Sequence, residues 1–141
     1  MTLQEIQEQI VDEFSVFEEW LDKYEYLIEL GNSLENIDEK FKTNEYLING
    51  CQSRVWVNAE MDDDKIIFKA DSDAIITKGI VALLIRVLSK RKPEEVMNAE
   101  LFFIDKIGLT QNLSPTRSNG LLAMVKQMKM YGMAYHAKLN K

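Results

Sequence analysis

Residues 55 to 70, "VWVNAEMDDDKIIFKA", carry the pattern that decides the fold. Apolar side chains occupy every second position from Val55 to Met61, which is the period of a strand with one buried face. The three aspartates at 62 to 64 resist burial and indicate a turn, and residues 65 to 70 have the composition of a returning strand. The stretch therefore predicts a β-hairpin.

Towards the N-terminus, the pattern changes from strand to helix. Residues 3 to 28 place apolar side chains at steps of three and four, which predicts one amphipathic helix, and Gly31 is expected to end it as a glycine C-cap. Residues 34 to 45 are polar and predict a loop with a short helical turn. Residues 46 to 49 are expected to add a short extra strand to the hairpin.

Towards the C-terminus, the chain is predicted to be helical. Residues 74 to 88 are apolar nearly all round, which predicts a helix packed across the sheet, with Asp73 as its N-cap. Residues 93 to 109 predict two short helical pieces broken near Asn98. Ser114 is the expected N-cap of a long final helix, which begins with a proline in its first turn.

These elements predict an α+β fold: a single domain with one small antiparallel sheet and helices packed on one of its faces. The chain has 141 residues, enough to bury a core, and no repeat or linker divides it. We therefore expect residues 1 to 141 to form one domain.

Charge and composition exclude several classes of function. The net charge is −6 and no basic stripe is present, so neither nucleic acid nor an anionic membrane is an expected partner. No basic region followed by an apolar run marks a signal peptide at the N-terminus, and the most apolar stretch is too short to span a bilayer. One unpaired cysteine suits a reducing compartment, so we expect a cytoplasmic protein.

The chain has one cysteine and one histidine, which excludes a thiolate zinc site or an iron–sulfur cage made by this chain alone. No metal site is therefore expected. His136 lies in a helix tail rich in Lys and Ala and is expected at the surface. A cluster of methionines is expected to fill the core rather than bind a ligand: Met124, Met128, Met130 and Met133.

Cys51 leaves two interpretations open. A lone cysteine is commonly a small buried hydrophobic residue. Gly50 precedes it and permits backbone conformations closed to other residues, and the polar Gln52 and Ser53 follow it. This setting suits a loop that presents a thiol. A single thiol can accept a sulfur atom from one protein and transfer it to the thiolate of another.

Arg117 lies in the first turn of the final helix, where a cation opposes the helix dipole by several tenths of a kcal/mol. Pairing with Asp71 or Asp73 is the simplest compensation, and stabilising a thiolate or docking a partner is the alternative. Trp56 is expected to pack on the sheet face, although an exposed tryptophan beside a reactive loop would suit an interface.

With these residues in view, the chain resembles the SufE family of sulfur-acceptor proteins. The family often has a histidine just before the LSP element, where this chain has Asn112, and this departure argues against a catalytic need for an imidazole there. The matching stretches follow the family's order and spacing and cover most of the chain: "YLIELG" (26 to 31), "NGCQSRVW" (49 to 56), "ADSDAIITKGIVALL" (70 to 84) and "GLTQNLSPTRSNGLLAMV" (108 to 125).

The resemblance implies a partner for a pyridoxal-phosphate cysteine desulfurase of the SufS type. Cys51 would accept the persulfide sulfur of the desulfurase. The protein would stimulate turnover of the desulfurase and would pass the sulfur to an iron–sulfur assembly scaffold. Gly50, Gln52, Asp73 and Arg117 would support the loop or the desulfurase interface. The implied fold is shared with IscU-type scaffolds. We expect no cofactor on this chain, no turnover without the partner, and a monomer or weak homodimer.

Two other functions remain open. The first is a non-catalytic adaptor that regulates a partner through its surface, with Cys51 structural. The second is a one-cysteine peroxidase, although no threonine–cysteine–arginine arrangement for binding peroxide is recognisable. For the carrier, we expect Cys51 to rest sheltered in the free protein, and desulfurase binding to move its loop outward into electropositive surroundings.

Overall fold

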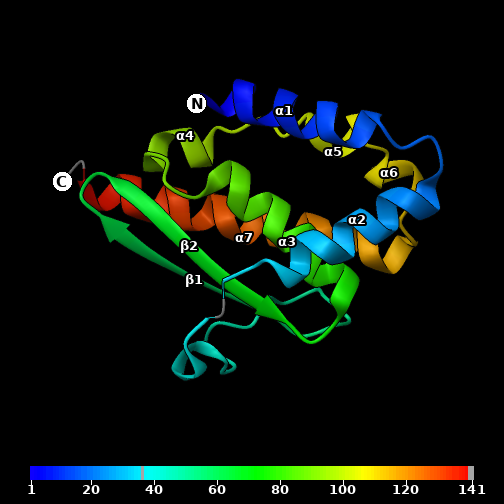
Figure 1. Cartoon of the computed structure of the whole chain (residues 1–141). Coiled ribbons are helices and arrows are strands. Elements are labelled where there is room, and N and C mark those ends of the chain that lie inside the picture. The colour runs from blue at the N-terminus through cyan, green and yellow to red at the C-terminus, as the bar shows by residue number, and fades with distance from the viewer. Residues whose placement is uncertain (36, 140–141) are drawn as a thin grey trace.

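A computed structural model of the chain describes residues 1–35 and 37–139, and in them a β-hairpin packs one face against helices (Figure 1). Residue 36, within the predicted loop 34 to 45, and residues 140 and 141 at the chain end lie outside the described residues. The elements in chain order are α1 (Leu3–Ser15), α2 (Trp20–Asn32), the 3₁₀ helix η1 (Glu39–Phe41), β1 (Val55–Asp62), β2 (Lys65–Ser72), α3 (Ile75–Leu88), α4 (Pro93–Met97), α5 (Phe103–Lys106), α6 (Leu109–Asn112) and α7 (Pro115–Leu139).

The hairpin confirms the strand prediction. β1 and β2 pair antiparallel from Val55↔Ser72 to Asp62↔Lys65, joined by a two-residue turn in which Asp63 has φ +59°. The expected extra strand is reduced to one bridge, Leu47↔Trp56. Trp56 itself is half-buried on the sheet face that points away from the core.

The core lies between the hairpin and the helices. α3 is buried over most of its surface and packs on β2, as its uniformly apolar sequence predicts. α7 runs beside it, and two tyrosine hydroxyls fix α7 to β1: Tyr131 donates to the Val57 carbonyl at 3.4 Å and Tyr135 to the Ala59 carbonyl at 2.9 Å. Helices therefore cover one face of the hairpin (Figure 1), which confirms the α+β prediction.

The prediction of a single helix over residues 3 to 28 is wrong, because two helices occupy this stretch. α1 ends at Ser15 and α2 begins at Trp20. The chain folds back so that the Tyr26 ring packs against Phe14, with ring centroids 5.1 Å apart, and its hydroxyl donates to Glu13 at 2.6 Å. A straight helix of that length would extend about 39 Å, and its apolar stripe would run past a core of this size.

Gly31 does not act as a C-cap, because α2 continues to Asn32 and Ser33 occupies the C-cap position. Gly31 instead faces Gly79 of α3, and a Cβ added to Gly31 would lie 2.8 Å from the Gly79 nitrogen. A Cβ added to Gly79 would lie 2.1 Å from the Leu27 carbonyl oxygen. The two glycines therefore let the α2 and α3 backbones come into contact.

Asp73 is not the N-cap of α3, since Ala74 takes that position and the Ser72 hydroxyl accepts its N–H at 3.2 Å. The predicted break near Asn98 is confirmed, because Asn98 is the C-cap of α4. Ser114 caps α7 as predicted: its hydroxyl accepts the Arg117 N–H at 3.3 Å.

The methionine prediction is right for only two of its four residues. Met124 and Met128 are buried, whereas Met130 and Met133 are 49% and 58% exposed, because they lie on the outer side of α7. His136, farther along α7, is partly exposed. None of the described helices combines the length and the apolar character needed to cross a membrane.

Candidate functional site

Cys51 lies on the loop that leads into β1, and its side chain is half-buried against the first turns of α7. Gly50 before it has φ +95°, which confirms the expected special backbone conformation. The Cys51 thiol donates a hydrogen bond to the Gly120 carbonyl of α7, with Sγ 3.5 Å from the oxygen. A Cβ added to Gly120 would lie 3.5 Å from the Cys51 Sγ, an ordinary van der Waals contact, so the loop lies against the helix without needing a glycine there.

A cleft of about 420 Å³ opens beside the thiol, between the Cys51 loop, α3 and α7. Its apolar walls, Ile80 and Met124, are buried, while most of its polar residues, Arg117 among them, are exposed at the rim. The lining residues are Cys51, Gln52, Ser53, Thr77, Ile80, Ser114, Thr116, Arg117, Gly120 and Met124. Cys51, Gln52 and Arg117 thus come together at one cleft.

The surroundings of Cys51 favour the protonated thiol. Burial raises the pKa of the Cys51 thiol above its usual range, since the thiolate loses hydration there. The hydrogen bond to the Gly120 carbonyl acts in the same direction, because only the protonated thiol can donate it. The resting site therefore holds a weak nucleophile.

The expected pairing of Arg117 with Asp71 or Asp73 is wrong. The Arg117 guanidinium instead lies over the Tyr24 ring of α2, 5.8 Å from its centroid, which is a cation–π contact. Asp73 is exposed, and its carboxylate accepts the backbone N–H of Arg54 at 3.0 Å. Asp73 therefore braces the loop that carries Cys51, whereas Arg117 forms part of the cleft rim.

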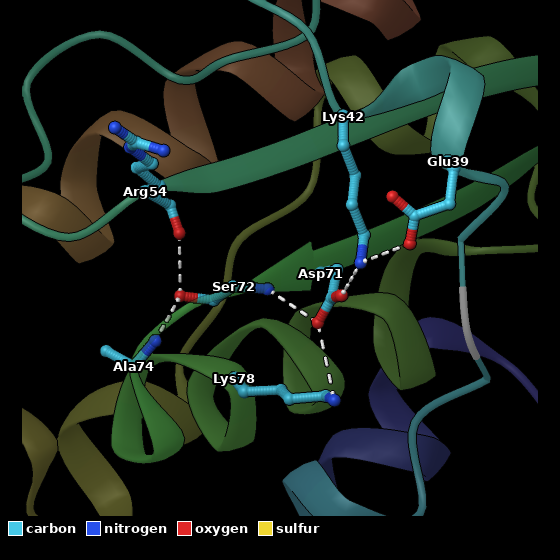
Figure 2. A network of polar contacts seen from close by, with 7 residues as sticks. All are labelled: Glu39, Lys42, Arg54, Asp71, Ser72, Ala74 and Lys78. Carbon is cyan, nitrogen blue, oxygen red and sulfur yellow. Dashed lines mark hydrogen bonds and ion pairs between the residues drawn. The ribbon is translucent and has the colours of Figure 1, made fainter.

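Asp71 is the centre of a charged network (Figure 2). Its carboxylate lies 2.9 Å from the Lys42 ammonium and 3.3 Å from that of Lys78, and it accepts the Ser72 N–H at 2.8 Å. Burial alone would raise the pKa of Asp71, but the hydrogen bonds from Lys42, Ser72 and Lys78 outweigh it, so the pKa lies below the usual range. The network ties the segment before the Cys51 loop to β2 and α3.

Both ends of the Cys51 loop are thus fixed to the hairpin. Lys42 precedes the loop and reaches Asp71, and it also lies 6.0 Å from the centroid of the Trp56 ring. After Cys51, the Ser72 hydroxyl donates to the Arg54 carbonyl at 2.8 Å (Figure 2). Sequence reasoning missed Lys42 and Ser72, because neither belongs to a local pattern that points to the cysteine.

No group of three or more His, Cys, Asp or Glu side chains that could hold a metal ion occurs among residues 1–35 and 37–139. The chemistry that the site can offer is therefore that of one thiol beside a half-open cleft, on a loop fixed at both ends. Thr77 also lines this cleft, on its α3 side. Sequence reasoning did not single it out, because it has the pattern of an ordinary position of the buried helix.

Comparison with known proteins finds one matching family. The family model for SufE, described as an Fe-S metabolism associated domain, matches residues 8–132. SufE-like protein 1, chloroplastic/mitochondrial, of Arabidopsis thaliana is 42% identical over a region that covers 86% of this chain and 33% of that protein. The chain thus spans about a third of the length of this relative.

Two bacterial relatives are similar to this chain over most of their own length. An uncharacterized SufE-like protein of Rhizobium meliloti (strain 1021) is 36% identical, covering 86% of this chain and 91% of the relative. Another, of Rhizobium etli, is 39% identical and covers 86% of each. The solution structure of a hypothetical protein from Thermus thermophilus superposes with a TM-score of 0.75 at 20% identity, covering 92% of this chain and 94% of that one, which supports the fold.

Proposed function

Because the chain belongs to the SufE family, we propose that it is a sulfur carrier, which accepts a sulfur atom on Cys51 from a cysteine desulfurase. The donor in this proposal is a pyridoxal-phosphate enzyme of the SufS type in the cytoplasm, and the carrier stimulates its turnover. The recipient is an iron–sulfur assembly scaffold. The carrier itself uses no cofactor and turns over nothing without its partner.

The observation that carries the proposal is the position of the Cys51 thiol beside a cleft, on a loop with a glycine hinge. Transfer needs only this one sulfur atom on the carrier. The Cys51 thiolate attacks the outer sulfur of the donor persulfide, a new S–S bond forms on Cys51, and the donor cysteine leaves as a thiolate that takes up the proton. Atoms and electrons balance without an added oxidant.

The raised pKa of Cys51 supports a transfer that waits for the partner. In the free protein the thiol donates to Gly120 and is a weak nucleophile. Desulfurase binding moves the loop outward by rotation at Gly50 and places Cys51 among cations. The rate of Cys51 alkylation should therefore rise when the desulfurase is bound, and equal rates in the free and bound protein would reject this step.

The packing of Cys51 favours a second function, that of an adaptor protein with a structural cysteine. Cys51 packs against the core cluster and its thiol is bonded to Gly120, as a structural cysteine would be. In that case the protein is an adaptor, which stimulates its partner through its surface and never carries sulfur itself.

The replacement Cys51→Ser separates the two functions, because serine keeps the size and the hydrogen bond but cannot form a persulfide. With a desulfurase and cysteine, the carrier predicts that Cys51→Ser binds the desulfurase but loses sulfur delivery to a scaffold. The adaptor predicts that stimulation and delivery persist. A Gln9→Ala variant, on the exposed side of α1, serves as the matched control and should behave as the wild type.

A further inference from the structure

Thr77 has an environment that its place in a buried helix does not explain. It is 8% exposed, yet its hydroxyl has no hydrogen-bond partner among the described residues. No described buried side-chain oxygen or nitrogen is both fully enclosed and unpartnered, so the hydroxyl must reach open space. The space that Thr77 lines is the cleft beside Cys51.

The cleft has a polar rim and a largely apolar interior. Gln52, Ser114, Thr116 and Arg117 are exposed, and Arg117, the one charged residue of the described lining, turns towards Tyr24. The deeper walls are Ile80, Met124 and Gly120, which are buried. Among the described lining residues, Thr77 alone is both buried and able to donate a hydrogen bond from its side chain.

We propose that the outer sulfur of a Cys51 persulfide enters this cleft and accepts a hydrogen bond from the Thr77 hydroxyl. The inference rests on the proposed function, because it requires Cys51 to carry sulfur. The added sulfur lies about 2 Å beyond Sγ, and a cleft of about 420 Å³ has ample room for it. Thr77 is a positioning residue, which holds the cargo after transfer and takes no part in bond exchange.

The Thr77 hydrogen bond should affect the pKa of the Cys51 persulfide but not the pKa of the unloaded Cys51 thiol. The resting thiol donates to the Gly120 carbonyl, so it does not need Thr77. A deprotonated persulfide cannot donate, and between apolar walls its charge needs a donor. A hydrogen bond to the charged form favours it, so Thr77 should lower the pKa of the persulfide and leave the pKa of the thiol unchanged.

Thr77→Val tests this, because valine has the same shape without the hydroxyl. Wild type and variant are loaded with inorganic polysulfide, and the pH dependence of alkylation of the outer sulfur is followed by intact mass. We expect the persulfide pKa to rise by about one unit in Thr77→Val, to return in Thr77→Ser, and to stay unchanged in Thr43→Val, which alters an exposed threonine outside the cleft. The thiol pKa of the unloaded proteins should not differ.

Two results would overturn the inference: an equal persulfide pKa in wild type and Thr77→Val, or an equal shift in thiol and persulfide. A second measurement needs no variant. The ¹³C methyl resonance of Thr77 should move on loading the wild-type protein, and an unmoved resonance counts against the contact.

Chemical loading keeps this test separate from the proposed function. If the desulfurase adds no sulfur but the chemically loaded protein behaves as expected, the carrier proposal fails and the Thr77 contact stands. If the desulfurase loads Cys51 but Thr77→Val changes nothing, the contact fails and the carrier proposal stands.

Discussion

Cys51 combines an accessible position with a low resting reactivity. Its side chain lines an open cleft, but burial and the hydrogen bond to Gly120 both favour the protonated thiol. A sulfur carrier benefits from both properties, since an idle thiolate would react with any electrophile in the cell. In the proposed function, Cys51 would therefore react only when partner binding changes its surroundings.

The pH dependence of Cys51 alkylation in the free protein tests this arrangement. The pKa is raised, so the thiolate fraction should still be increasing at pH values above the usual thiol pKa of about 8.5. The rate should accordingly level off at a higher pH in the folded protein than in the unfolded protein. The same thiol in the protein unfolded by denaturant is the control and should titrate near about 8.5. A midpoint in the folded protein at or below the control value would contradict the account.

At the scale of elements, the crossing of α2 and α3 places one wall of the cleft. α3 carries Thr77 and Ile80, and its distance from α2 is set by Gly31 and Gly79. Packed backbones of this kind leave no room for a methyl group. A substitution at the α2–α3 crossing should therefore lower the stability of the fold. It should change the cleft only by displacing α3.

Gly79→Ala should lower the free energy of unfolding by about 3 kcal/mol, because its Cβ would lie 2.1 Å from the Leu27 carbonyl oxygen. Urea denaturation of both proteins measures the change. Gly120→Ala is the matched control on α7, since its Cβ would meet the Cys51 Sγ at an ordinary 3.5 Å. Gly120→Ala should not be destabilised. Equal stabilities for Gly79→Ala and wild type would refute the close crossing.

The Asp71 network makes a second element-scale prediction. Asp71→Asn removes the negative charge between Lys42 and Lys78 and should cost about 2 kcal/mol of unfolding free energy at neutral pH. Asp64→Asn is the control: its pair with Lys92 is 3.9 Å long and exposed, so its loss should cost less than about 0.5 kcal/mol.

The pH dependence of this difference has a definite sign. The folded pKa of Asp71 is depressed, so its contribution to stability is full above the unfolded pKa of about 3.9 and is lost as pH falls through the folded pKa. The stability difference between wild type and Asp71→Asn should therefore be constant near neutrality and shrink in acid. A difference that grows as the pH falls would contradict the network.

The local sequence pattern predicted the helices and strands better than it predicted where one helix ends and how the elements contact one another. The alternation in β1 and the apolar length of α3 are properties of neighbouring residues, and both predictions were confirmed. The break between α1 and α2 was missed, because the helical spacing of apolar residues continues through it. The Asp71–Lys42 pair and the α2–α3 crossing join residues far apart in the chain, so no local pattern indicates them.

At the scale of the whole molecule, the site is made where separate parts of the chain meet. The Cys51 loop, the start of α3 and the start of α7 each supply one side of the cleft. The loop was identified in the sequence by its cysteine and glycine, and the α7 side by Arg117. The partner predicted for Arg117 was wrong, because the packing of α2 puts Tyr24 beside it. The resemblance named the right family, but the contacts at the site came only from the fold.

The proposed function requires that Cys51 carry the sulfur as a persulfide between its transfer from the desulfurase and its transfer to the scaffold. The most direct test is the intact mass of the protein after incubation with cysteine and a cysteine desulfurase. A carrier should gain one sulfur atom, located on Cys51, removed by a reductant and absent from Cys51→Ser. Wild-type protein that gains no sulfur, or a Cys51→Ser variant that gains as much, would contradict it.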